Sequence, residues 1–233
     1  MDFIKLLSSL DELLYEVMSW LAFYPRTLVR ILRHPVAVAQ YTRLQMQQPK
    51  EQQFAEAISP PLLLILSILL AHVLELICAV PLPDQTTRLA TLLMGNEEGL
   101  LAFRSVSFSL YALLASWWVL KRTDTRIDRD TLREPFFIQS FLTSPFAVIG
   151  SIASIMCRSQ APWGVACGLA IGVAITLWYV LAQASVYRHM TGGGMGRSLL
   201  FASTVFLLTS ALLLVGSYLI MVGLTLAPFQ VSS

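Results

Sequence analysis

The stretch PPLLLILSILLAHVLELICAVPL, residues 60–82, decides the fold class. Two prolines open it, and Pro81 and Pro83 close it. The roughly 20 residues between them are almost all apolar, which is enough for a helix to cross a hydrocarbon layer of ~30 Å. Ser59, directly before the prolines, is typical of a helix N-cap followed by proline in the first turn. We therefore expect a transmembrane helix over residues 60–82.

Four further apolar stretches have the length of membrane spans. They lie at about residues 100–120, 136–157, 163–187 and 198–226. The 233-residue chain is 56% hydrophobic and 13% charged, whereas soluble domains carry about 25% charged residues. The sequence predicts an all-α membrane bundle with five transmembrane helices. We expect three regions: interfacial helices and a polar connector over 1–58, the membrane domain over 59–228, and a short external tail over 229–233.

The segment before the first span is predicted to lie at the membrane surface. Apolar residues recur at steps of three and four over 3–21, so an amphipathic helix is expected there. Charged residues on its other side exclude a spanning role. Arg26, Arg30 and Arg33 follow on one helical face. They fit either contacts with anionic lipid headgroups or simple topology signals, and the two interpretations are compatible.

Basic residues predict the orientation of the chain. They concentrate before the first span, in the stretch KRTDTRIDRDTLREP (121–135) and at Arg188 and Arg197, whereas the opposite loops offer only Arg88 and Arg158. Because basic loops stay in the cytoplasm, we expect a cytoplasmic N-terminus and an external C-terminus. The 121–135 stretch is expected to be a solvated loop. The glycine-rich 192–196 segment is expected to be a flexible link, with a lipid phosphate beside Arg188 and Arg197 as the alternative.

His72 and Glu75 are ionisable residues within the first span, three positions apart on one helical face. A carboxylate exposed to lipid is costly, so this face should turn into the bundle or a wet cavity. The pair fits a structural hydrogen-bonded contact between helices or a proton- or cation-linked transport site. Arg104, near one end of the second span, is a candidate ion-pair partner for Glu75. No metal site and no cofactor are expected, because no further ligand cluster is evident.

Small residues indicate where helices pack closely. Gly164, Gly168 and Gly172 form a double GxxxG pattern on the fourth span. A seven-residue spacing on the fifth span predicts a second packing face, whose members are Ser210, Gly216, Ser217 and Gly223. Both patterns fit contacts within one chain or between two copies.

Other function classes are not indicated. The chain has no Gly-x-Ser-x-Gly or His-Glu-x-x-His motif, so we predict that it is not an enzyme. A formal net charge of +2 gives no indication of nucleic-acid binding. The expected partners are membrane lipids and either a second copy or another membrane protein.

The chain resembles the Yip1-domain membrane proteins, in particular their bacterial, permease-like members. The shared features are a proline-spaced N-terminal segment (FYPRTLVRILRHPVAVAQY), five spans, and a glycine-rich turn before the last span (YRHMTGGGMGRSLLFAS). The resemblance implies a self-associating helical bundle in the bacterial inner membrane, with a membrane-organising or transport-accessory role. A non-enzymatic scaffold is thus the leading hypothesis. The alternative is an oligomeric permease or channel for a small solute or lipid that uses His72 and Glu75.

Overall fold

The computed structural model describes residue 18 and residues 23–49, 52–54, 58–78, 96–159 and 161–222. Regular structure in these residues is helical: residues 23–33 are followed by α2 (Pro35–Met46), α3 (Pro60–Ile77), α5 (Glu97–Arg122), α6 (Arg129–Arg158), α7 (Gly164–Thr191) and α8 (Met195–Val222). Five of them, α3 and α5–α8, are long and apolar enough to cross a membrane. The predicted all-α fold with five spanning helices is therefore confirmed.

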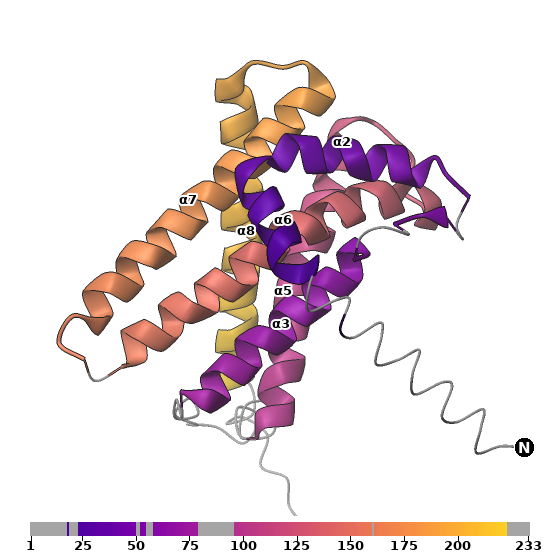
Figure 1. Ribbon diagram of the computed structural model, residues 1–233. Helices are drawn as coiled ribbons and strands as arrows, with labels where there is room; N and C mark the ends of the chain where they lie inside the picture. Colours follow the sequence, from indigo (N-terminus) through magenta and orange to yellow (C-terminus); the bar gives the residue numbers. More distant parts are fainter. Residues whose placement is uncertain are drawn as a thin grey trace, which may run out of the picture.

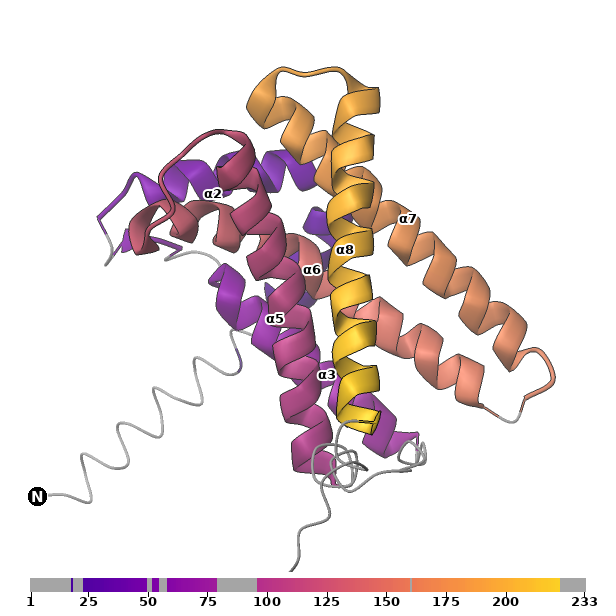
Figure 2. The same ribbon diagram turned by 180° about the vertical axis from the view of Figure 1, so that it is seen from behind.

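Helix α6 is the centre of the bundle. It packs against α3, α5 and α7 along its length, and α2 lies across one end of it (Figure 1). The ring of Tyr179 stacks on that of Phe146 at 4.7 Å between centroids, and Tyr111 and Phe206 pack around the same pair. Seen from behind, α8 stands between α5 and α7, and the α6–α7 hairpin inclines away from it (Figure 2). Aromatic packing thus joins four of the spans at mid-bundle.

Local sequence chemistry explains where the helices begin and end. The Asn96 side chain accepts a hydrogen bond from the Gly99 N–H at 2.7 Å and caps α5. Acidic residues in the first turn of α5 and basic residues in its last turn complement the helix dipole. Helix α7 ends at Gly192, whose φ of 67° is a conformation that glycine adopts without a Cβ penalty. These ends of α5 and α7 follow from residues visible in the sequence, whereas Ser59 precedes α3 as expected but its side chain makes no capping hydrogen bond.

The helix bounds differ from the expected ones at several places. Helix α7 runs past the expected residue 187 to Thr191, and α8 already begins at Met195, so only residues 192–194 link the two helices. Helix α3 ends at Ile77, five residues before the expected end of the span. The stretch 121–135 is not mainly a loop, because α5 continues to Arg122 and α6 already begins at Arg129. Asp128 starts α6 early, since its side chain accepts from the Thr131 N–H at 2.9 Å and the Thr131 hydroxyl accepts from the Asp128 N–H. The hydrogen bond from the Thr131 backbone lowers the pKa of the Asp128 carboxyl.

The N-terminal segment is attached to the bundle. The indole Nε1–H of Trp178 donates to the carbonyl of Leu32 at 3.0 Å, and the Tyr24 hydroxyl donates to Ser67 on α3 at 2.9 Å. Burial raises the pKa of the Tyr24 hydroxyl, although the Ser67 hydrogen bond lowers it slightly. The amphipathic helix expected over residues 3–21 lies outside the described residues, apart from Met18.

Candidate functional site

A cluster of charged side chains lies where α3 ends, α5 begins and α6 ends. Glu75 of α3 is buried, with 6% of its surface exposed. One carboxylate oxygen pairs with the guanidinium of Arg104 from α5, and the other accepts from Arg158 of α6 at 2.6 Å. Such charge-assisted contacts are about twice as strong as neutral ones. A single carboxylate therefore joins three helices.

His72 lies one turn earlier on α3 and extends this cluster. Its Nε2 is 3.7 Å from Oε2 of Glu97, in the first turn of α5. The His72 Nδ1 and one terminal nitrogen of Arg104, Nη1, are buried and have no hydrogen-bond partner among the described residues. The cluster thus combines an ion-paired core at Glu75 with two buried nitrogen atoms that have no partner in the described part of the chain.

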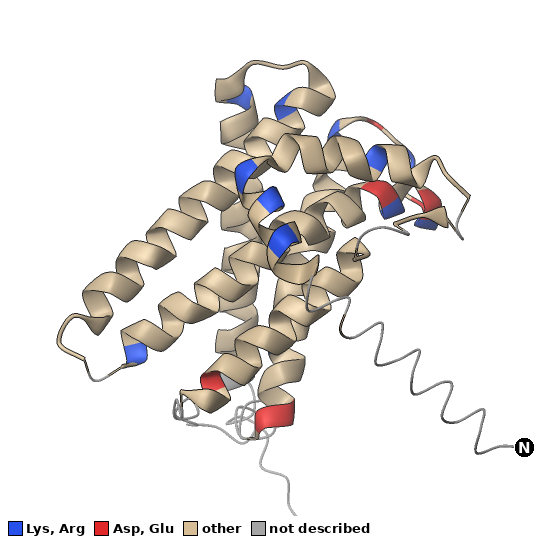
Figure 3. Cartoon of the chain, viewed as in Figure 1, with Lys and Arg blue, Asp and Glu red and all other residues tan. Residues whose placement is uncertain are grey.

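His72 and Glu75 lie less deep than the sequence suggested. Since α3 ends at Ile77, both occupy its final two turns, close to one end of the bundle. In Figure 3 the acidic segments of α3 and α5 lie at this end, and the basic segment in the last turn of α6 lies on the same side of the bundle. The expected partner Arg104 is present, whereas Arg158 and Glu97 had not been considered as members of the cluster. Among the described residues, no group of three His, Cys, Asp or Glu side chains has the geometry to hold a metal ion.

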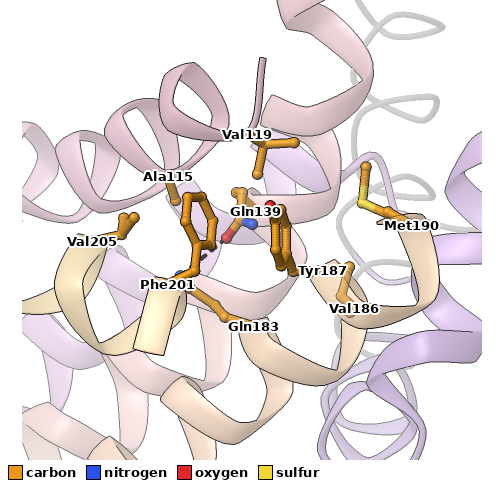
Figure 4. Close-up of a pocket in the computed structure, with 9 residues that line it drawn as sticks. All are labelled: Ala115, Val119, Gln139, Gln183, Val186, Tyr187, Met190, Phe201 and Val205. Atoms are coloured by element: carbon orange, nitrogen blue, oxygen red, sulfur yellow. Dashed lines mark hydrogen bonds between the residues drawn. The ribbon is translucent and has the colours of Figure 1, made fainter. Parts of the chain in front are cut away.

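A second polar contact lies inside the bundle and was missed in the sequence. Gln183 of α7 donates from its Nε2 to Oε1 of Gln139 on α6 at 3.2 Å, and both side chains are buried. Figure 4 shows the two amides facing each other in a pocket closed by Val119, Tyr187 and Phe201. The enclosed space is only about 10 Å³, roughly the volume for one water molecule. The only sequence signal was an uncharged glutamine in each of two apolar spans.

The three glycines of the double GxxxG pattern lie at the contact between α7 and α6. A Cβ at Gly168 would come within 2.6 Å of the Ala153 carbonyl and 2.5 Å of the Cys157 sulfur. A Cβ at Gly164 would collide with Ser159, and one at Gly172 would meet Ala153 at 3.7 Å. The structure therefore uses this glycine face for close packing within one chain.

The packing face expected on α8 is used only in part. The Ser210 hydroxyl is 2.9 Å from the Tyr111 hydroxyl of α5, so this position does contact a neighbouring helix. Gly216 has open space where a Cβ would lie, and Ser217 is half-buried. Gly223 lies outside the described residues. The second half of α8 thus makes little contact with the other described residues.

Residues 23–33, which carry Arg26, Arg30 and Arg33, begin beside the middle of α3, where the Tyr24 hydroxyl contacts Ser67. Arg188 and Arg197, at the α7–α8 turn, lie at the end of the bundle opposite the Glu75 cluster. We call this the basic end: α5 ends there, α6 begins there, and α7 turns into α8. Arg26, Arg30 and Arg33 are exposed, as are Arg188 and Arg197 at the α7–α8 turn. Figure 3 shows basic and no acidic segments at this turn. The structure leaves these cations accessible from outside the bundle.

We compared the chain with known proteins. The chain matches no family model, no curated protein and no solved structure. The resemblance to Yip1-domain proteins therefore stays a prediction that depends on the quoted segments alone.

Proposed function

We propose that this chain is a non-enzymatic membrane protein that organises the membrane or assists transport as a scaffold. The observation that carries the proposal is the pairing of Glu75. A carboxylate that carries a proton or cation must exchange partners, whereas both oxygens of Glu75 are engaged by guanidinium groups from α5 and α6. This arrangement fits a side chain that fixes three helices relative to one another.

The outer surface of α7 supports a role in lipid or protein contacts. One stripe of this helix consists of exposed aliphatic side chains at every fourth position. Its members are Val165, Leu169, Val173, Leu177 and Leu181. Helix α8 adds an exposed aliphatic surface through Leu212, Val215 and Leu219. In a membrane such surfaces contact acyl chains, a second copy or another membrane protein.

The resemblance to Yip1-domain proteins is part of this proposal. The resemblance implies that the protein self-associates and lies in the bacterial inner membrane. The distribution of basic residues predicts a cytoplasmic N-terminus and an external C-terminus. The basic end of the bundle would then face the cytoplasm.

A permease or channel is the second candidate, and one observation favours it. The buried Nδ1 of His72 and Nη1 of Arg104 have no hydrogen-bond partner among the described residues, so a polar solute could bind there. Buried polar atoms without partners are rare and costly, which makes them candidate contacts for a ligand. In this alternative His72 and Glu75 act in an oligomer.

Native mass spectrometry of the chain released from its own membrane tests the two functions. A stoichiometric membrane-protein partner, without a retained small solute, would support the scaffold. A bound small solute that is lost in Glu75→Gln, while the variant keeps its wild-type melting temperature, would overturn the scaffold in favour of the permease. Glu134→Gln is the matched control, since Glu134 also pairs with an arginine, Arg43, at 2.8 Å.

A further inference from the structure

A groove opens on the surface of the basic end, between the last turns of α5 and the first turns of α8. It has a volume of about 130 Å³. Trp118 and Arg122 of α5 form one side, and Arg197 and Leu200 of α8 form the other. Phe201 forms part of the floor and is held in place by stacking on Tyr187, with 4.2 Å between ring centroids. The stacked Phe201 ring thus gives the groove one side chain that is packed in position.

Two arginines at this groove have no acidic partner. Among the described residues, Arg122 and Arg197 form no ion pair, whereas Arg43, Arg104 and Arg158 each contact a glutamate. The Arg122 guanidinium instead lies 6.0 Å from the ring centroid of Phe201. Arg197 is in the first turn of the 28-residue helix α8, where the helix dipole also favours an anion. The groove therefore has a surplus of positive charge.

The apolar side of the groove begins one turn from these arginines. Leu200 is 72% exposed, and Trp118 is half-buried beside it. A soluble anion such as phosphate gains nothing from an exposed leucine and an indole ring. A phospholipid has an anionic headgroup joined to an acyl chain, which matches two arginines next to an apolar wall.

We propose that this groove binds one anionic phospholipid. The phosphate lies between Arg122 and Arg197, and the start of one acyl chain follows Trp118 and Leu200. This proposal rests on the proposed function, in which the protein acts through lipid contacts. It names the class of lipid that binds and the residues that bind it. It differs from general surface attraction because a defined pair of side chains holds one molecule.

Lipid titration of the purified full chain tests the site. Native mass spectra are recorded in mild detergent with phosphatidylglycerol or phosphatidylcholine, for the wild type and for Arg122→Gln/Arg197→Gln. Arg126→Gln/Arg129→Gln is the matched control, because it removes two charges from the exposed α5–α6 turn at the same end. One phosphatidylglycerol should bind preferentially, and its affinity should fall about 25-fold in the groove variant, because each arginine contributes roughly fivefold. The control should retain it.

Several results would overturn the site. Equal retention of both lipids, equal loss in the two variants, or displacement of the lipid by inorganic phosphate would each contradict a phospholipid groove. Selective phosphatidylglycerol binding that is unchanged in Arg122→Gln/Arg197→Gln would refute this location but leave the proposed function standing. Retention of a small solute dependent on Glu75, with no selective lipid, would refute both.

Discussion

Replacing Glu75 by glutamine should destabilise the bundle more than any other single loss of charge described above. The variant keeps the shape of the side chain but leaves two guanidinium groups facing each other without an anion. Removing one partner of a buried ion pair costs about 3–5 kcal/mol. The Arg104 side chain is 15% exposed and that of Arg158 is 31% exposed, so solvent screens part of this loss. We expect a decrease of about 3 kcal/mol in the free energy of unfolding.

The measurement is a denaturant titration of the purified chain in mild detergent, with unfolding monitored by circular dichroism. Glu134→Gln is the control, since the Arg43–Glu134 pair has side chains 37% and 39% exposed and should contribute no more than about 1 kcal/mol. Adding Arg158→Gln to Glu75→Gln should recover part of the loss, because it removes one unpaired cation. The reasoning is refuted if Glu75→Gln costs no more than the control.

Three further predictions concern packing, the buried amides and a helix cap. Gly168→Ala should lower the free energy of unfolding by about 1–3 kcal/mol because its Cβ would press on α6, whereas Gly150→Ala, with open space at its Cβ, should be neutral or stabilising in the same titration. Gln183→Leu should lower the free energy of unfolding by about 1–3 kcal/mol because it leaves Gln139 unpaired. Replacing both glutamines by leucine should restore most of this stability, and additive losses in the double variant would contradict the pairing. The pKa of Asp128 is lowered in the fold, so the capped start of α6 should be stable above the ordinary carboxyl pKa and weaken as the pH falls through the lowered value. An NMR titration that finds an ordinary or raised pKa for Asp128 would refute that contact.

Hydropathy and length predicted the five spans because apolar runs of this size have one stable arrangement in a bilayer. The contact between Glu75 and Arg104 could be anticipated, since both residues lie toward the same ends of neighbouring spans. The contact of Arg158 with Glu75 was missed because it depends on how α3 and α6 cross. The spacing of apolar residues along each helix does not determine this crossing. The cap at Asp128 was available in the sequence, where threonine follows three positions later.

The buried amides could not be predicted in the same way. Gln139 and Gln183 are 44 residues apart and carry no charge. Their pairing follows from the antiparallel register of α6 and α7, which also brings Gly168 against Ala153. Such a register depends on both contacting helix faces and cannot be deduced from the sequence of either helix alone.

The short length of α3 has a consequence for the surrounding bilayer. Its 18 residues rise about 27 Å as a helix, and the 28 residues of α7 rise about 42 Å. The ion cluster lies in the last turns of α3, where it needs to be near headgroup water. The α6–α7 hairpin is inclined relative to α8 in Figure 2, and a tilt of this kind would shorten the distance that its long helices span. At about 27 Å, α3 is about 3 Å shorter than a ~30 Å hydrocarbon layer, so we expect the protein to favour membranes that are thin or easily thinned beside α3.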